Sequence, residues 1–385
     1  MVTFEALDAA YGDCLMVHYS QNDEAGQPQR QLWLIDGGPT ETYPRALAPR
    51  LRELQAQQGG NGPLRIRLGV VTHIDDDHID GMGKLIGAMA ENPPPAGTPD
   101  LRFQEFWFNG FQATFGTTAQ AGGSVASLAS NDVFMASAPG PETAMFIQGV
   151  RDGETLLRNL GALKPGGRVP QTLNQSFGSE AHQKALAPRV IRFGTNGPKL
   201  EILTPTQPRL DALKTKWAEA TGSDAALQAF VRGKIDTSVA NLSSIVFLAT
   251  IDRKTLLLTG DGLAEHIIEG WKDRAGNTDP FPIDLMKVPH HGSSANNSEA
   301  LFRLFPARHY VFCANGKHDN PDMFTLQALK NACGQNRFTV HLTYEEAHPA
   351  TAAQTAFLKA MAAASNGRID LNFRKPNALS VPVAL

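Results

Sequence analysis

The sequence lacks the features that mark several large classes of protein. Among its 385 residues no apolar run is longer than about seven residues, whereas a membrane-spanning helix needs about 20. No basic and apolar leader precedes the strand expected at residues 3–7, and the three cysteines lie far apart without a CxxC pair. We therefore expect a cytoplasmic protein with reduced thiols, and neither a membrane span nor a secretory signal.

A strong charge of one sign is also lacking, as are the common nucleotide-binding motifs. The chain carries 35 basic and 38 acidic side chains, and its formal net charge of −3 excludes a protein that binds polyanions with its whole surface. No P-loop, no GxGxxG after a strand and no GxSxG occurs. Functions that depend on nucleoside triphosphates or on a serine nucleophile therefore have no support.

The order of the expected elements favours an α/β fold. Helices are predicted at residues 44–57, 76–89, 142–163, 210–231, 263–273, 323–332 and 351–363, and strands precede and follow them, among them 66–72, 103–108, 255–259 and 285–288. Hairpins and helices alternate irregularly, which fits two mixed sheets with helices outside them. We expect residues 1–385 to form a single domain, with an irregular insertion at about 111–190 that shapes access to the site.

The strongest chemical signal directly follows a buried strand. Residues 73–78 read HIDDDH, so that His73 and Asp75 lie in a loop and Asp77 and His78 lie in the first turn of the next helix. Imidazole and carboxylate groups that converge from one short loop are typical of a metal site. The dipole of a helix N-terminus explains acidic residues there, but it does not explain two histidines.

Two later strand ends add further acidic and imidazole groups. Residues 256–262 (LLLTGDG) place Asp261 after a strand, although this pattern is also ordinary turn chemistry. Residues 284–294 (DLMKVPHHGSS) contain His290 and His291. Because adjacent side chains point in different directions, we expect only His290 to be a ligand, with His291 supporting the site or the turn.

Together these pieces resemble the metallo-β-lactamase superfamily, and within it the ComEC/Rec2-like branch, typified by the C-terminal domain of a DNA-uptake protein. That branch is similar in reading THxDxDH, NxSxV, LTGD and VxHHGS, and the corresponding segments here are residues 72–78, 241–246, 258–261 and 288–293. Residues 11–13 (YGD) and 34–38 (LIDGG) match its opening strands. The resemblance covers residues 2 to about 325. It implies a four-layer αββα sandwich of two mixed sheets, with metal ions at the seam between them.

The resemblance also implies roles for individual residues. One or two divalent ions, Zn²⁺ or Mn²⁺, would be held by six residues with Asp261 as the bridge: His73, Asp75, Asp77, His78, Asp261 and His290. Asp75 stands where most of the superfamily has a histidine, which makes one position rich in oxygen and suits Mn²⁺ or Fe²⁺ at least as well as Zn²⁺.

A further histidine of the superfamily is missing, because His182 alone lies in the relevant interval. We do not expect His182 to be a ligand. Asn241 or Ser243 occupies the region instead, so the position of His73 and Asp75 is expected to hold its ion weakly.

The chemistry implied by the resemblance needs no covalent protein nucleophile. A metal ion lowers the pKa of bound water to about 7, and a second ion stabilises the leaving oxygen. Asp77, Asp261 and His318 are the expected catalytic residues. Lys317, His291 and Asn241 are the expected substrate contacts. Residues 315–321 (NGKHDNP) resemble the Gly-His-Pro loop of the branch, and a solvated turn is the alternative interpretation.

Two enzymatic functions fit these features. The carboxylate-rich site and the resemblance favour a phosphodiesterase or nuclease, with Lys287, Lys317 and Arg308 as local cations at the mouth. Hydrolysis of a neutral ester, lactone, thioester or amide is the alternative, and it suits a net charge near zero. The complete ligand set argues against a non-catalytic binding protein. Nucleic acid and small molecules are therefore the candidate partners, and no membrane partner is expected.

Overall fold

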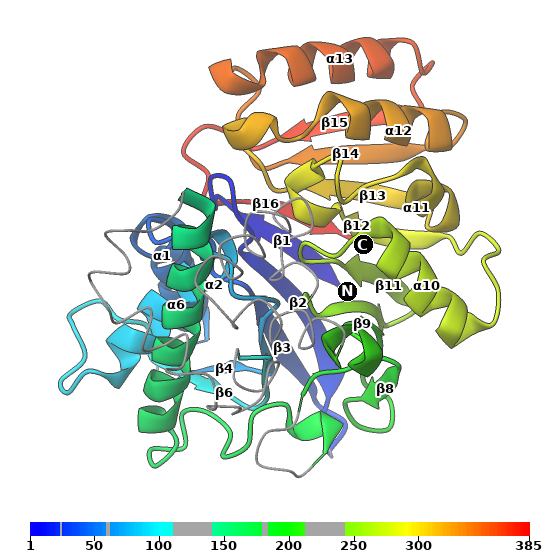
Figure 1. Ribbon diagram of the computed structural model, residues 1–385. Helices are drawn as coiled ribbons and strands as arrows, with labels where there is room; N and C mark the ends of the chain where they lie inside the picture. Colours follow the sequence, from blue (N-terminus) through cyan, green and yellow to red (C-terminus); the bar gives the residue numbers. More distant parts are fainter. Residues whose placement is uncertain (24, 59–61, 111–140, 179–183, 212–242) are drawn as a thin grey trace.

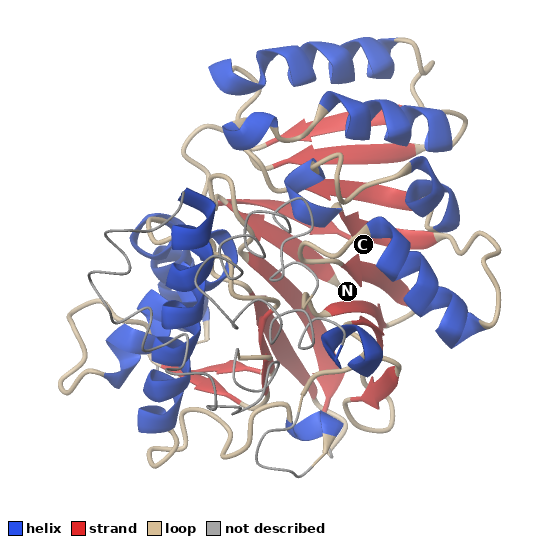
Figure 2. Ribbon diagram, viewed as in Figure 1, coloured by secondary structure: helices blue, strands red, loops and turns tan. Residues whose placement is uncertain are grey.

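The computed structural model describes residues 1–23, 25–58, 62–110, 141–178, 184–211 and 243–385. The chain is α/β, with helices and mixed sheets (Figures 1 and 2). Asn241 and His182 lie outside the described residues, and so do residues 111–140 and most of the helix predicted at 210–231.

The first sheet has six strands in the order β16-β1-β2-β3-β5-β7. The pairs from β16 to β3 are antiparallel, whereas β3, β5 and β7 run parallel. β5 is buried along its whole length, as its apolar sequence LGVV requires of a central parallel strand. The strands are β1 (Thr3–Leu7), β2 (Leu15–Asn22), β3 (Pro28–Ile35), β5 (Leu68–Val71), β7 (Phe106–Phe108) and β16 (Ser380–Ala384).

The second sheet has eight strands in the order β15-β14-β13-β12-β11-β10-β9-β8. Its pairs from β8 to β11 are antiparallel, and its pairs from β11 to β15 are parallel. A two-stranded sheet of β4 (Leu64–Ile66) and β6 (Leu101–Phe103) lies apart from both. The eight strands are β8 (Arg189–Arg192), β9 (Lys199–Thr204), β10 (Val246–Ile251), β11 (Lys254–Leu258), β12 (Ile283–Lys287), β13 (Ala307–Phe312), β14 (Phe338–Leu342) and β15 (Ile369–Phe373).

Helices pack on the faces of the sheets that point away from each other (Figure 1). Three of them accompany the first sheet: α1 (Ala48–Gln57), α2 (Asp76–Ala90) and α6 (Pro141–Leu163). Four accompany the second sheet: α10 (Ala264–Ala275), α11 (Glu299–Leu304), α12 (Met323–Cys333) and α13 (Ala352–Ala363). Among the described residues, none of the helices combines the length and the apolar character needed to cross a membrane.

A third core cluster joins the two sheets. Trp33 and Trp107 of the first sheet pack in one cluster with Phe247 and Leu256 of the second. The rings of Trp33 and Trp107 both contact that of Phe247 edge-on, with centroids 6.4 and 5.6 Å away. Aromatic side chains of this size bury much apolar surface. They therefore fix the sheets against each other and set the distance between the strand ends that carry the site.

Two glycines let α2 approach the end of β3. A Cβ atom on Gly81 would lie 1.9 Å from the carbonyl oxygen of Gly37, and one on Gly37 would lie 2.0 Å from the backbone nitrogen of Met82. The close approach allows the N–H of Gly37 to donate to the carbonyl of His78 at 2.7 Å. The first turn of α2, with its acidic and imidazole side chains, is thereby held beside the first sheet.

Most predicted elements agree with the structure to within a few residues, and one differs. The segment expected to be one strand at 103–108 is divided between β6 and β7, because Phe103 pairs with β4 while Phe106 pairs with β5. The helix predicted at 142–163 is the 23-residue helix α6, which packs on α2 and contributes Leu156 and Leu160 to the core beside the first sheet.

Candidate metal centre

The candidate ligands follow three strands at their C-terminal ends. His73 lies between β5 and α2, Asp261 comes after β11, and His290 and His291 come after β12. β11 and β12 are parallel neighbours, so their following loops lie at the same edge of the second sheet. Packing of the sheets brings the loop after β5 to this edge as well, as the ion-pair distances between its residues and Asp261 demonstrate.

Asp261 lies in the middle of the group and is 1% exposed. Its Oδ1 is 3.1 Å from Nε2 of His78. Its Oδ2 is 3.4, 3.7 and 3.8 Å from Nε2 of His290, His291 and His73, respectively. One carboxylate thus faces the same ring atom of four histidines, so it could be shared between two ions.

Two further carboxylates lie near the histidines that face Asp261. Asp75 Oδ2 is 3.4 Å from Nε2 of His73. Asp77 Oδ2 is 3.0 Å from Nε2 of His291, and its Oδ1 is 3.9 Å from Nε2 of His78. The structure therefore brings all six predicted ligands into one cluster, in two sets that meet at Asp261.

The outer nitrogen of each histidine has a hydrogen-bond partner. These Nδ1 atoms contact Thr72 Oγ1 (His73, 3.0 Å), Asp36 Oδ2 (His78, 2.9 Å), Asn296 Oδ1 (His290, 2.6 Å) and the Cys313 carbonyl (His291, 2.9 Å). A hydrogen bond at Nδ1 fixes the orientation and the tautomer of a ring, and it leaves Nε2 as the coordinating atom. All four rings are therefore oriented for coordination through the nitrogen that faces Asp261.

The inner polar atoms of the cluster are not accounted for by these hydrogen bonds. The buried Nε2 atoms of His73, His78 and His291 and the Oδ1 atom of Asp261 lack a hydrogen-bond partner of acceptable geometry among the described residues. Leaving buried polar atoms unpaired is costly, so each such group needs an explanation. Imidazole nitrogens and carboxylate oxygens are donors that Zn²⁺, Mn²⁺ and Fe²⁺ accept. The residues therefore fit a centre that could hold divalent metal ions.

The surrounding carboxylates hold protons on two of the imidazoles. Burial by itself lowers the pKa of His78, but Asp261, Asp36 and Asp77 outweigh burial and raise that pKa well above its ordinary value. Burial also opposes the rise at His291, where Asp261 and its neighbours raise the pKa to about 9. A metal ion that binds here must displace these protons.

Both His290 and His291 face the centre, although only His290 was expected to do so. Both have left-handed backbone conformations, with φ of 47° and 55°, and their ring planes are 77° apart. This unusual turn directs both Nε2 atoms toward Asp261 although the residues are adjacent. The His290 side chain is 30% exposed, whereas His291 is buried between Asp77 and Asp13.

Sequence reasoning missed the carboxylate of Asp36, which supports the centre. Its Oδ1 accepts a hydrogen bond from the backbone N–H of Thr72 at 2.7 Å, and its Oδ2 accepts from Thr72 Oγ1 at 2.8 Å as well as from His78. Asp36 stands in the LIDGG segment, directly after β3. A carboxylate that follows an apolar strand and precedes two glycines is the signal that would have found it.

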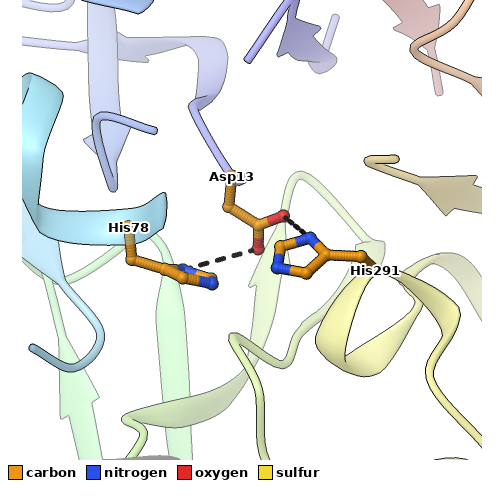
Figure 3. A group of neighbouring side chains, drawn as sticks. All are labelled: Asp13, His78 and His291. Carbon is orange, nitrogen blue, oxygen red and sulfur yellow. Dashed lines mark ion pairs between the residues drawn. The ribbon is translucent and has the colours of Figure 1, made fainter. Parts of the chain in front are cut away.

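A second missed carboxylate, Asp13, lies between His78 and His291 (Figure 3). Its Oδ1 is 3.4 Å from Nδ1 of His291, and its Oδ2 is 3.9 Å from Nδ1 of His78. These three side chains also lie close enough to hold an ion. However, Asp36 and the Cys313 carbonyl already engage both Nδ1 atoms, and an ammonium group lies 2.5 Å from Asp13.

That ammonium belongs to Lys287, and the prediction that Lys287 lies at the mouth of the site is wrong. Its side chain is 0% exposed. Along β12, Lys287 shares a strand face with Leu285, which packs in the core between the sheets. Arg308 is also wrongly predicted at the mouth, because it begins β13 and so lies at the opposite end of the strands from the ligands.

The other predicted contacts lie beside the cluster rather than within it. Lys317 and His318 are exposed in a short 3-10 turn, η5 (Lys317–Asp319). Lys317 Nζ is 3.2 Å from the ring centroid of Tyr11, and the ring of His318 is 6.4 Å from the same centroid. Tyr11 is two residues before Asp13, whose backbone N–H donates to the carbonyl of Asp77 at 3.0 Å. Lys317 and His318 are thus placed next to the loop that flanks Asp77.

Comparison of the chain with protein-family models finds no match, and comparison with curated proteins finds none either. Conclusions about function therefore depend on the geometry of the cluster and on the motifs that form it.

Proposed function

We propose that this protein is a metal-dependent hydrolase with the four-layer αββα arrangement of the metallo-β-lactamase superfamily. The observation that carries the proposal is the convergence of four Nε2 atoms and two further carboxylates around buried Asp261. Two facing sheets with helices outside them, and ligands at their common edge, support the proposed arrangement.

Divalent ions in this centre would lower the pKa of a coordinated water and so supply hydroxide at neutral pH. The side chains have separate tasks. Asp261 joins the two halves of the ligand set. Asp77, whose side chain is 17% exposed, borders solvent and orients the attacking water. His318 donates a proton to the leaving oxygen from the exposed turn beside Tyr11.

A phosphodiester is the favoured substrate, and the position of Lys317 is the reason. Its ammonium lies over the ring of Tyr11 beside a strongly acidic loop. Burial, Asp77 and Asp75 raise the pKa of Asp76, and the nearby charge of Lys317 opposes that rise. A cation at this place would pair with a substrate phosphate. A neutral ester, lactone or thioester, the alternative substrate, would gain nothing from it.

The first test is hydrolysis of bis(p-nitrophenyl) phosphate by the purified full-length protein. Chelation should abolish turnover, and Mn²⁺ or Zn²⁺ should restore it. Asp261→Ala should lower the restored rate by about 100-fold or more. Loss of a residue that only hydrogen-bonds to a metal ligand already lowers metal affinity or activity about 10–100-fold. Asp284→Ala is the matched control, since Asp284 is a carboxylate of β12 that bonds Thr255 and does not touch the cluster.

The second test separates the two substrate classes. Lys317→Gln should lower kcat/KM for the phosphodiester about 10-fold, equivalent to about 1.4 kcal/mol, and leave kcat/KM for a neutral lactone unchanged. Lys330→Gln is the control, because Lys330 is also an exposed lysine near an aromatic ring but lies in α12. Metal-loaded protein that hydrolyses lactones or thioesters and no phosphodiester would refute the favoured substrate.

A further inference from the structure

Lys287 and Asp13 form a fully buried ion pair behind the candidate metal centre. Nζ of Lys287 is 2.5 Å from Oδ2 of Asp13, and both side chains are 0% exposed. Lysine is almost never fully buried unless it is paired. Removing two charges from water costs several kcal/mol per ion, and apolar residues of similar size often stabilise a core better. Stability alone therefore does not explain the pair.

Lys287 is connected to the turn that carries Asp261. Its Nζ donates a hydrogen bond to the carbonyl of Gly260 at 2.9 Å and lies 3.7 Å from Oδ1 of Asp261. Its own carbonyl accepts a hydrogen bond from Thr259 Oγ1 at 2.8 Å. The lysine thus holds the turn that follows β11 against the end of β12, where Asp261 is presented.

Asp13 is connected to the other two ligand-bearing segments. Its Oδ1 is 3.4 Å from Nδ1 of His291, on the side of the ring opposite to the candidate coordinating nitrogen. Its backbone N–H donates to the carbonyl of Asp77 in the first turn of α2. The residue therefore contacts a ligand from each sheet, and its ion pair with Lys287 completes the link to Asp261.

The charges of the site are consistent with this arrangement. With neutral histidines, five carboxylates and the ammonium of Lys287 leave a formal charge of −4, which two divalent cations would neutralise; the carboxylates are those of Asp13, Asp36, Asp75, Asp77 and Asp261. An ammonium fixed by Asp13 adds positive charge next to Asp261 without occupying the space between the Nε2 atoms.

We propose that Lys287 and Asp13 are positioning residues of the metal centre: as one ion pair, they hold Asp261, His291 and the first turn of α2 in the geometry that binds the ions. The inference rests on the metal centre proposed above and not on the substrate of the enzyme.

The test measures Co²⁺ binding to the metal-free, full-length protein, by affinity and by visible absorption. Asp13→Asn keeps the shape of the side chain and removes its charge, while Asp261, 3.7 Å from Nζ, remains as a counter-charge for Lys287. It should weaken Co²⁺ binding about 10–100-fold, the range known for supporting residues, and should shift the absorption bands of the bound ion. Glu5→Gln is the matched control, because Glu5 is a buried carboxylate of β1 that pairs with Arg50 at 2.8 Å, away from the cluster. It should leave affinity and spectrum unchanged.

Two results would overturn the proposal. One is an Asp13→Asn protein with wild-type affinity and spectrum but reduced stability, since that is the behaviour of a merely structural ion pair. The other is a wild-type protein that binds no Co²⁺. Because no substrate is present, an absence of phosphodiester hydrolysis leaves this result unaffected. The first result would refute the role of the ion pair alone, whereas the second would also refute the metal centre of the proposed function.

A double variant tests whether the residues act as one pair. Lys287→Met alone leaves the buried carboxylate of Asp13 without its counter-charge and is expected to fold poorly. Asp13→Asn with Lys287→Met removes both charges, so the protein should fold. Its Co²⁺ affinity should be about that of Asp13→Asn alone, because the two changes disrupt the same link. If the double variant instead binds Co²⁺ much more weakly than Asp13→Asn, the two residues have independent roles and the proposal is contradicted.

Discussion

Asp36→Asn is expected to disable His78 as a ligand while hardly changing the shape of the site. The carboxylate accepts three hydrogen bonds, from the N–H of Thr72, the hydroxyl of Thr72 and Nδ1 of His78. Asparagine offers one oxygen in place of two. If that oxygen keeps the bond to the Thr72 N–H, the new NH₂ group faces Nδ1 of His78. The ring must then accept at Nδ1 and carry its proton on Nε2, the candidate coordinating atom.

The magnitude follows from the two orientations open to the amide. With the oxygen toward the Thr72 N–H, His78 binds metal only after its tautomer is reversed, and we expect a loss of metal affinity of about 10–100-fold, or about 1.4–2.7 kcal/mol. With the amide turned round, the buried N–H of Thr72 is unsatisfied and stability falls by about 1–3 kcal/mol. A metal ion favours the second orientation, because only there can His78 coordinate it. The variant should therefore bind metal more weakly than the wild type, and its metal-bound form should be less stable.

Competition with a chromophoric chelator measures Zn²⁺ affinity, and thermal unfolding of the Zn²⁺-saturated protein measures stability. Glu105→Gln is the control, because Glu105 is a buried carboxylate that accepts from Trp107 Nε1 at 2.8 Å and from the Ser176 N–H at 2.9 Å. It should lose stability and keep its metal affinity. An Asp36→Asn protein that binds Zn²⁺ as tightly as the wild type would refute the role of Asp36.

Three further predictions concern protons. Although burial raises the pKa of Glu5, hydrogen bonds from its neighbours lower it from 4.5 to about 2. The ionised side chain therefore contributes at most about 3 kcal/mol to the free energy of unfolding, and this contribution is present above pH 4.5 and is lost as the pH falls toward 2. In urea unfolding, the stability of Glu5→Gln should thus depend less on pH in this range than that of the wild type. Burial and Asp152 raise the pKa of Asp80 to about 6, so the wild type gains stability as the pH falls from about 6 to 4. Asp80→Asn should raise Tm at pH 7 by the equivalent of about 1 kcal/mol, a value reduced for solvent screening of this partly exposed group. An unchanged Tm would contradict this prediction. Zn²⁺ binding at pH 7 should release protons from His78 and His291, whose pKa values are raised, and calorimetric heats that do not depend on the buffer would exclude such release.

The elements that depend on local sequence were predicted well. Residues 76–89 and 323–332 were predicted as helices, and α2 and α12 have nearly these bounds. Apolar periodicity and polar residues at the helix start act within one segment, so they can be recognised without the rest of the chain. The division of residues 101–108 into β6 and β7 could not be predicted in this way, because distant partners, β4 and β5, determine it.

The same distinction applies to the candidate site. His73, Asp77, His78 and Asp261 were recognised because each follows a strand closely. The buried position of Lys287 was not recognised, because a lysine at a strand end is expected to be exposed unless the residue that pairs with it is known. That residue, Asp13, is 274 positions earlier in the chain and lies in the connection between β1 and β2 of the other sheet. Pairing between segments so far apart is a property of the packed sheets.

The long separation between the clustered groups also bears on the biosynthesis of the protein. The HIDDDH loop is translated early, but Asp261 follows it by 183 residues, and His291 by 213. A nascent chain that has released only the first loop offers an ion two imidazoles and a few carboxylates without the oriented Nε2 atoms of the folded cluster. If the protein binds the proposed ions, tight binding would therefore follow the closing of both sheets on each other, after both have left the ribosome.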